Sequence, residues 1–358
     1  MWSNVIIAFA LAVLTSFVIT PYTMRLAKKV GALDIPEKRK VHKKPIPRLG
    51  GIAVIVGFLV SVIYLLIILN MENVDIYDGQ DYYTKLAGFF VGILLLGITC
   101  FIDDSKGVTA IVKLCVQIIS ALIVCFAGIR IENINLPFLS GELNEVFSYI
   151  ITVCWIIGVT NAINLIDGLD GLSSGISLVS CVSLIMIFAL NGSPLLAMIL
   201  TTALAGAILG FLPFNFNPAK TFIGDTGSNF LGFSLAVISI LGVAKTYTAL
   251  VLVAPIIILG LPIFDTLFAI IRRIIKGKSL KAVLQPDRGH LHHRLMDKGY
   301  TQRQAVMILY GLSATLGLFT IVLLEGGIWK ALSFALLVIA LIGVGYKDIC
   351  NLRDNKEL

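Results

Sequence analysis

Long apolar runs alternate with short polar connections along the whole chain. The hydrocarbon core of a membrane takes about 20 apolar residues per helical span. Runs of this length recur from one end of the sequence to the other, so the pattern predicts a membrane protein of many helical spans. The eleven predicted spans cover residues 2–20, 49–70, 85–102, 108–128, 147–166, 172–190, 195–213, 227–243, 248–271, 305–323 and 328–346.

Composition supports this fold class. The chain is 58% hydrophobic and 14% charged, whereas soluble globular proteins are about a quarter charged. Five of the six cysteines lie in apolar runs and none forms a CxxC pair, which favours a packing role over metal binding or disulfides. The sequence therefore predicts an all-α, polytopic integral membrane protein, with residues 1–358 forming one transmembrane domain.

Basic residues divide unevenly between the two sides that eleven spans define. One side receives 23 of the 28 Lys and Arg residues and the other receives 4, while Lys113 falls inside a span. Cytoplasmic loops carry the Lys/Arg excess, so we expect the N-terminus outside and the C-terminus in the cytoplasm. The basic charge gathers in loops that face anionic lipid headgroups, and no nucleic-acid partner is expected.

Five aspartates fall in the predicted cytoplasmic connections or at their edges. For any one of them, a helix end that meets water is a sufficient explanation. Five that converge from three connections favour a shared function, because ionisable groups beside membrane spans are costly. They are Asp103 and Asp104 in FIDDSKG, Asp167 and Asp170 in NLIDGLDGL, and Asp225 in FIGDTGSNF.

The stretch NLIDGLDGL suggests what these carboxylates do. Asn164, Asp167 and Asp170 are spaced by three, so they share one face if the segment is helical. Gly168 and Gly171 permit a helix break or a close backbone approach. Carboxylate oxygens without cysteine suit Mg²⁺, with Mn²⁺ as a substitute, better than zinc.

A basic segment from residue 272 to 304 contains the sequence DRGHLHHRL. His290, His292 and His293 could form a zinc site, but the HExxH spacing is missing. Flanking Arg288 and Arg294 favour binding of phosphate groups instead. The residues alone thus predict a cytoplasm-facing, metal-dependent site for phosphate chemistry, with a lipid as a possible substrate.

Four motifs in this order, FIDDSKG, NAINLIDGLDGL, NFNPAKTFIGDTGS and DRGHLHHRL, resemble the polyprenyl-phosphate N-acetylhexosamine-1-phosphate transferase family. The resemblance begins at KKPIPRLGG and reaches the histidine segment. It implies transfer of GlcNAc-1-phosphate from UDP-GlcNAc to undecaprenyl phosphate, with release of UMP. Family members of this kind initiate O-antigen lipopolysaccharide, enterobacterial common antigen or the teichoic-acid linkage unit in cell wall biogenesis. The expected location is the bacterial cytoplasmic membrane, with the active site on its cytoplasmic face.

The resemblance also implies roles for individual residues. Asp225 matches the metal-binding aspartate, with Asp167 beside the metal, and Asp103 and Asp104 match a catalytic pair in which we favour Asp103 as the base. Phe222 matches a residue that stacks on uracil. The remaining residues matched to substrate binding are Lys106, Asn164, Asp170, Asn215, Arg288, His290, His292 and His293.

Several alternatives stay open. The donor could be another UDP-HexNAc, carrying GalNAc or MurNAc-pentapeptide, although Leu291 interrupts the three consecutive histidines typical of the branch that uses MurNAc-pentapeptide. An ion-coupled transporter would place its carboxylates near the bilayer midplane, on repeated halves. A lipid-binding scaffold would explain the basic loops but not the aspartates. The resemblance further suggests a homodimer.

Overall fold

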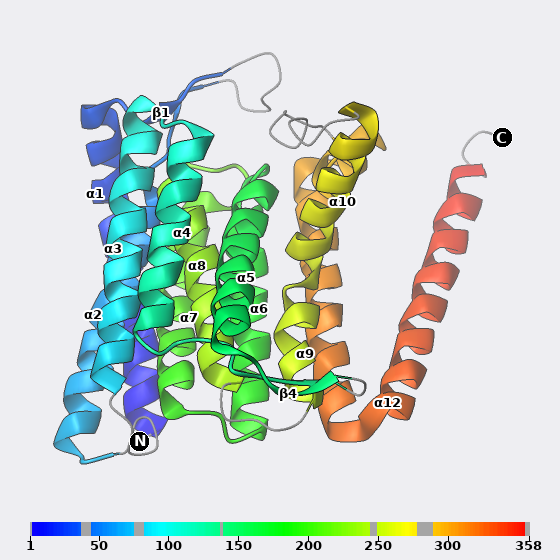
Figure 1. Ribbon diagram of the computed structural model, residues 1–358. Coiled ribbons are helices and arrows are strands. Elements are labelled where there is room, and N and C mark those ends of the chain that lie inside the picture. Colours follow the sequence, from blue (N-terminus) through cyan, green and yellow to red (C-terminus); the bar gives the residue numbers. More distant parts are fainter. Residues whose placement is uncertain are drawn as a thin grey trace.

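Helices make up almost all of the regular structure in this computed structural model, which describes residues 2–36, 44–74, 82–136, 139–243, 249–277 and 289–354. The helices stand side by side as a bundle (Figure 1). Their bounds are α1 (Trp2–Val30), α2 (Gly50–Met71), α3 (Tyr82–Lys106), α4 (Ala110–Phe126), α5 (Glu145–Ile166), α6 (Leu172–Leu190), α7 (Leu195–Asn215), α8 (Gly224–Val243), α9 (Ala249–Ile258), α10 (Gly260–Gly277), α11 (Leu291–Asp297) and α12 (Gln302–Asp354).

Within the described ranges, seven helices are long and apolar enough to cross a membrane, and α4 is a shorter apolar helix. A helix satisfies its own backbone hydrogen bonds, which is why apolar segments adopt this form in lipid. The prediction of an all-α polytopic membrane protein is confirmed. The number of eleven spans and the orientation of the termini stay predictions.

Two of the long apolar segments contain breaks. The predicted span 248–271 is divided into α9 and α10 around Leu259, and Pro262 in the first turn of α10 has no backbone N–H to donate across the break. Helix α12 departs from helical geometry at Gly327 (φ 73°, ψ 179°). Its two parts run in opposite directions (Figure 1), as the predicted spans 305–323 and 328–346 require.

Small residues let the central helices approach closely. Gly206 and Gly210 of α7 lie against the backbone of Phe9 and Val13 in α1, where an added Cβ would collide. Such small-residue contacts are typical of helix packing in membranes. A cluster of buried aromatic rings joins α2, α3 and α8, with centroids 5.4–6.2 Å apart; it consists of Phe58, Phe89, Phe230 and Phe233.

Two short antiparallel ribbons lie at opposite ends of the bundle (Figure 1). Strands β1 (Leu33–Asp34) and β2 (Ile46–Pro47) pair beside the start of α2, and β3 (Asn133–Leu136) pairs with β4 (Leu139–Glu142) at the end nearer the N-terminus. The α3–α4, α5–α6 and α7–α8 connections all lie at the β1 end, where α12 also finishes (Figure 1). The predicted site residues therefore share one end of the bundle.

Candidate active site

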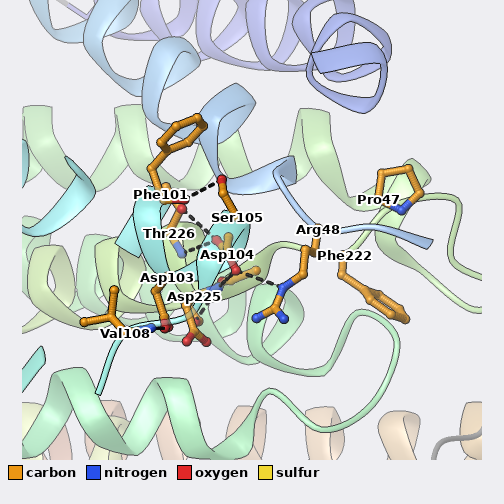
Figure 2. Close-up of polar contacts among 12 residues, drawn as sticks. Pro47, Arg48, Phe101, Asp103, Asp104, Ser105, Val108, Phe222, Asp225 and Thr226 are labelled. Carbon is orange, nitrogen blue, oxygen red and sulfur yellow. Dashed lines mark hydrogen bonds and ion pairs between the residues drawn. The ribbon is translucent and has the colours of Figure 1, made fainter. Parts of the chain in front are cut away.

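Asp104, near the end of α3, fastens the start of α8 to the rest of the bundle. Its carboxylate accepts hydrogen bonds from the backbone N–H of Asp225 (3.0 Å) and from both the N–H (2.9 Å) and the hydroxyl (2.7 Å) of Thr226. Arg48 adds an ion pair at 2.9 Å (Figure 2). The side chain of Asp104 is fully buried, and it satisfies N–H groups that a helix start leaves without partners.

The segment before α2 shapes the same contact. The carbonyl of Pro47 accepts from Phe222 N–H (2.8 Å), and Gly50 N–H donates to the carbonyl of Phe222 (3.0 Å). Gly224 has φ +71° and lies against both the carbonyl of Arg48 and the carboxylate of Asp104, so a side chain at this position would be strained and would collide. These contacts explain why glycine precedes Asp225.

Asp103 and Asp225 share one cation. Lys113 of α4 lies 2.8 Å from Asp103 Oδ2 and 3.0 Å from Asp225 Oδ2, measured from its Nζ atom. Asp103 Oδ1 also accepts from the N–H of Val108 at 2.6 Å (Figure 2). The side chain of Asp225 is 23% exposed, against 8% for Asp103. Asp225 is thus the most accessible carboxylate of the three on α3 and α8.

A layer of amide side chains supports Asp225 from the membrane side. Asn164 of α5 donates to Asp225 Oδ1 (3.0 Å) and to the hydroxyl of Ser228 (2.8 Å). One turn below, Gln117 of α4 donates to Asn229 of α8 (3.0 Å), and Asn229 donates to the backbone carbonyl of Asp225 (2.9 Å). Three helices therefore fix the position of this carboxylate.

The NLIDGLDGL stretch is a helix break. Helix α5 ends at Ile166, Gly171 has φ +77°, and α6 begins at Leu172. Asp167 and Asp170 both lie beyond the end of α5, so the condition for a face shared with Asn164 is not met and the segment adopts the helix break that its glycines permit. Tyr310 of α12 holds the turn by donating its hydroxyl to the carbonyl of Gly171.

Asp167 follows the last residue of α5 and accepts from the hydroxyl of Ser173 at 2.6 Å. Burial raises the pKa of Asp167 to about 7, and the negative charges of Asp225 and Asp104 act in the same direction. The Ser173 hydrogen bond and the charge of Arg48 oppose this shift. The pKa of Asp167 thus responds to the charges of the Asp104–Asp225 cluster.

Asp170 and Asn215 hold the loop between α7 and α8. Asp170 accepts from the side chain of Asn217 (2.9 Å) and from the N–H of Ala219 (3.0 Å). The buried Asn215 accepts from the hydroxyl of Ser174 (2.8 Å) and donates to the carbonyl of Thr221 (3.1 Å). The partly exposed ring of Phe222 points away from the carboxylates (Figure 2). These contacts position the loop that precedes Asp225.

The histidine segment, residues 289–297, packs against the NLIDGLDGL turn between α5 and α6. His290 and His292 have nearly parallel rings with centroids 5.7 Å apart, and His293 lies 4.2 Å from His292. The ring of His292 occupies the space beside the Cα of Gly168. Burial and the neighbouring histidines lower the pKa of His292 to about 3. Arg288 lies outside the described residues.

In the part of the chain that the structure describes, no group of three or more His, Cys, Asp or Glu residues is arranged to hold a metal ion. His290, His292 and His293 do not form such a group within these ranges.

Comparisons with known proteins identify the family of this chain. The family model for "Glycosyl transferase family 4" matches residues 86–243. The chain is 39% identical, over 94% of its length and 89% of the relative's, to the "Probable undecaprenyl-phosphate N-acetylglucosaminyl 1-phosphate transferase" of Bacillus subtilis (strain 168). This chain belongs to glycosyl transferase family 4.

Two further family 4 relatives come from distant bacteria. The "Decaprenyl-phosphate N-acetylglucosaminephosphotransferase" of Mycobacterium tuberculosis (strain ATCC 25618 / H37Rv) is 33% identical over 85% of this chain and 78% of its own length. The "Undecaprenyl-phosphate alpha-N-acetylglucosaminyl 1-phosphate transferase" of Escherichia coli (strain K12) is 30% identical over 80% and 75%, respectively. The family resemblance seen in the motifs is confirmed.

The structure of this family 4 member also reveals contacts that the sequence did not. Among the described residues, Arg48 and Lys113 form the ion pairs with the three carboxylates, whereas the predicted Lys106 is exposed at the end of α3. Lys113 lies inside an apolar run of the sequence and outside the four motifs. Its position inside the run was itself the available signal, since a lysine in a span requires a partner.

Proposed function

We propose that this protein transfers GlcNAc-1-phosphate from UDP-GlcNAc to undecaprenyl phosphate, which gives undecaprenyl-diphospho-GlcNAc and UMP. A phosphate oxygen of the lipid forms a bond to the β-phosphorus of the nucleotide sugar. The bond from that phosphorus to the oxygen bridging to the α-phosphorus breaks, and UMP leaves with the electron pair. The names of the relatives, all of them polyprenyl-phosphate GlcNAc-1-phosphate transferases, support this assignment.

The observation that carries the proposal is the grouping of Asp103, Lys113 and Asp225 at one end of the bundle. The reaction brings two anions together, so catalysis depends on positioned cations and on electrostatic stabilisation of the developing charge. Lys113 and Arg48 supply fixed positive charge beside the carboxylates. Asp103 is the base or orienting group for the lipid phosphate, because Asp104 is already committed to Arg48 and the start of α8.

The residues fit a Mg²⁺ ion shared with the substrate. Protein Mg²⁺ sites usually use one or two carboxylates and complete the coordination with substrate phosphates. Asp225 is partly exposed, and the charge of Asp225 disfavours ionisation of Asp167, an effect that a divalent cation would offset. Asp225 and Asp167 would hold the ion. When bound, it would stabilise negative charge on the diphosphate.

The remaining substrate contacts are assigned by position. The α7–α8 loop with Phe222 would face the uracil, and His290, His292 and His293 would face the diphosphate and sugar. Arg288 and Lys106 are carried only by the family resemblance. The same resemblance supports a cytoplasm-facing site in a bacterial cytoplasmic membrane and a homodimer, as well as a role at the start of teichoic-acid or O-antigen synthesis.

A radiolabelled transfer assay tests the function. The purified protein in detergent, supplied with undecaprenyl phosphate and Mg²⁺, is expected to move label from UDP-GlcNAc to lipid and to release UMP. UDP-GalNAc and UDP-MurNAc-pentapeptide are run in parallel, and transfer from either in preference to UDP-GlcNAc would reassign the donor. EDTA is expected to stop the reaction and added Mg²⁺ to restore it; unchanged activity after removal of the metal would overturn the metal-dependent mechanism.

A further inference from the structure

Asp265 is a buried carboxylate to which the proposed reaction gives no role. It lies on α10 in the sequence LPIFDTLF and is 5% exposed. A carboxylate is rarely buried unless it is paired or hydrogen-bonded. The side chain therefore needs partners. Among the described residues, its hydrogen-bond partners are His290 and Leu291, which lie in the histidine segment.

The two oxygens of Asp265 bind adjacent residues. Oδ2 lies 2.8 Å from Nδ1 of His290, whose ring is itself buried. Oδ1 accepts from the backbone N–H of Leu291 at 2.9 Å, the first residue of α11. An ionised carboxylate can only accept, so His290 Nδ1 carries the hydrogen, and in the neutral form of the ring Nε2 is then an acceptor on the other side.

A second contact joins the same two elements. Arg272 lies seven residues, about two helical turns, after Asp265 on α10, and its guanidinium occupies the space beside Gly289. Helix α10 thus meets the histidine segment at residues 289, 290 and 291. Contacts with α10 therefore fix the position of the first residues of the histidine segment.

The contacts continue from His290 to the aspartate turn. The ring of His290 is parallel to that of His292, and His292 lies against Gly168, which follows Asp167. A rotation of the His290 ring would therefore disturb His292 and the turn that carries Asp167. This path of packed groups gives Asp265 an influence on the site without contact with substrate.

We propose that Asp265 is a positioning residue that holds His290 as its Nδ1–H tautomer, with Nε2 presented as an acceptor toward the sugar hydroxyls. The inference rests on the proposed function of the histidine segment. An aspartate that fixes the tautomer and orientation of a histidine in this way is well known from hydrolytic enzymes. Here the aspartate also anchors the helix that follows the histidine.

The variant Asp265→Asn separates tautomer control from anchoring. An asparagine oxygen can still accept from Leu291 N–H, but its amide would donate to Nδ1 and drive the hydrogen to Nε2. We expect transfer to fall by about 10²-fold or more, as is typical when a histidine takes the wrong tautomer. Asp297→Asn, the same change on the exposed end of α11, is the matched control and is expected to keep wild-type activity.

Nitrogen NMR of histidine-labelled protein reads the tautomer directly, because the chain has only 4 histidines. One wild-type imidazole is expected as the Nδ1–H form. That signal should vanish in His290→Gln and change to the Nε2–H form in Asp265→Asn. Adding Asp265→Asn to His290→Gln should cause no further loss of activity, since both changes act on one group.

The outcomes separate the two proposals. If the wild-type protein transfers no label from any UDP-sugar, the proposed function fails, while the NMR result still decides the tautomer. If the protein is active but Asp265→Asn matches wild type in rate and in His290 signal, the inference is overturned. Equal losses in Asp265→Asn and Asp297→Asn would overturn it as well, because the effect would not depend on His290.

Discussion

Asp103 and Asp104 are neighbours in sequence and yet occupy opposite kinds of environment. Asp104 is fully buried and has four hydrogen-bond donors, among them Arg48 and Thr226. Asp103 turns toward Lys113 and Asp225, where the cluster is partly open. Adjacent helical residues point about 100° apart, so one side chain enters the packed interior and the other faces the partly exposed Lys113 and Asp225. We call Asp104–Arg48 the closed pair, because it holds the start of α8 in the bundle. We call Asp103–Lys113–Asp225 the open group, because its side chains are partly exposed.

The largest expected effect is at the open group. Asp225→Asn should abolish transfer, by about 10³-fold or more, because the most exposed carboxylate would lose its charge. Folding should persist, since the amide still bonds Asn164 and the backbone contacts to Asp104 do not involve this side chain. Radiolabelled transfer and the melting temperature in detergent measure the two effects. A variant that melts much earlier than wild type would place Asp225 with the closed pair instead.

At the closed pair the main effect should be on stability. Asp104→Asn would turn an amide group toward donors from Arg48, Asp225 or Thr226, and breaking a buried ion pair costs about 3–5 kcal/mol. The melting temperature should fall markedly. Asp103→Asn is the matched neighbour and should melt close to wild type, because its side chain is less buried. Equal losses of stability would remove the distinction between the two aspartates.

Asp103 should instead show a pH-dependent loss of activity. Asp103→Asn is expected to lose about 10²-fold near neutral pH, within the usual contribution of a general base. The second ionisation of a phosphate lies near pH 6, so the lipid phosphate needs the base less as pH rises and part of the rate should return. Exchange of labelled UMP into UDP-GlcNAc from pH 6 to 9 is the measurement. A flat pH profile for the ratio of variant to wild type would make Asp103 a positioning group.

The shared cation should have a more moderate effect. Lys113→Met keeps most of the side-chain volume but leaves Asp103 and Asp225 without the charge between them. A loss of about 1–2 kcal/mol of electrostatic stabilisation at a partly exposed pair corresponds to about 5- to 30-fold in rate. Lys106→Met tests the residue that the motif suggested and should reduce activity less. If Lys106→Met loses more activity than Lys113→Met, Lys106 of FIDDSKG is the more important lysine for transfer.

The fold class and most of the candidate site could be predicted from the sequence, because apolar length and motif order are local signals. The partners of the aspartates could not. Arg48 reaches Asp104 across 56 residues, and Lys113 reaches Asp225 across 112. The spacing of Asn164, Asp167 and Asp170 could not decide between a continuous helix and a break, and the structure has the break that the glycines of NLIDGLDGL permit, after Ile166. The sequence places Lys113 inside a span, but it does not reveal that Asp103 and Asp225 balance its charge.

The smallest expected effect is a loosening of the histidine segment in mild acid. The pKa of His292 is about 3 in the folded protein, below its ordinary value of 6.5, with burial as the main cause. Between pH 6.5 and about pH 3, His292 binds a proton in the unfolded segment but not in the folded one. The free energy of unfolding of this segment is therefore highest above about pH 6.5 and declines as the pH falls. The expected loss is up to about 1.4 kcal/mol per pH unit.

Hydrogen exchange of the 289–297 amides at pH 7.5 and 5.5, corrected for intrinsic rates, should therefore show weaker protection at the lower pH. His292→Phe preserves an aromatic ring beside Gly168 but cannot bind a proton, so its protection should not change with pH. The backbone amides of Gln117 and Asn229, whose side chains bond each other and are not titratable, provide an internal reference. If the reference amides lose protection equally, or if His292→Phe behaves as wild type does, the acid effect belongs to the bundle as a whole and the two regions do not differ in this respect.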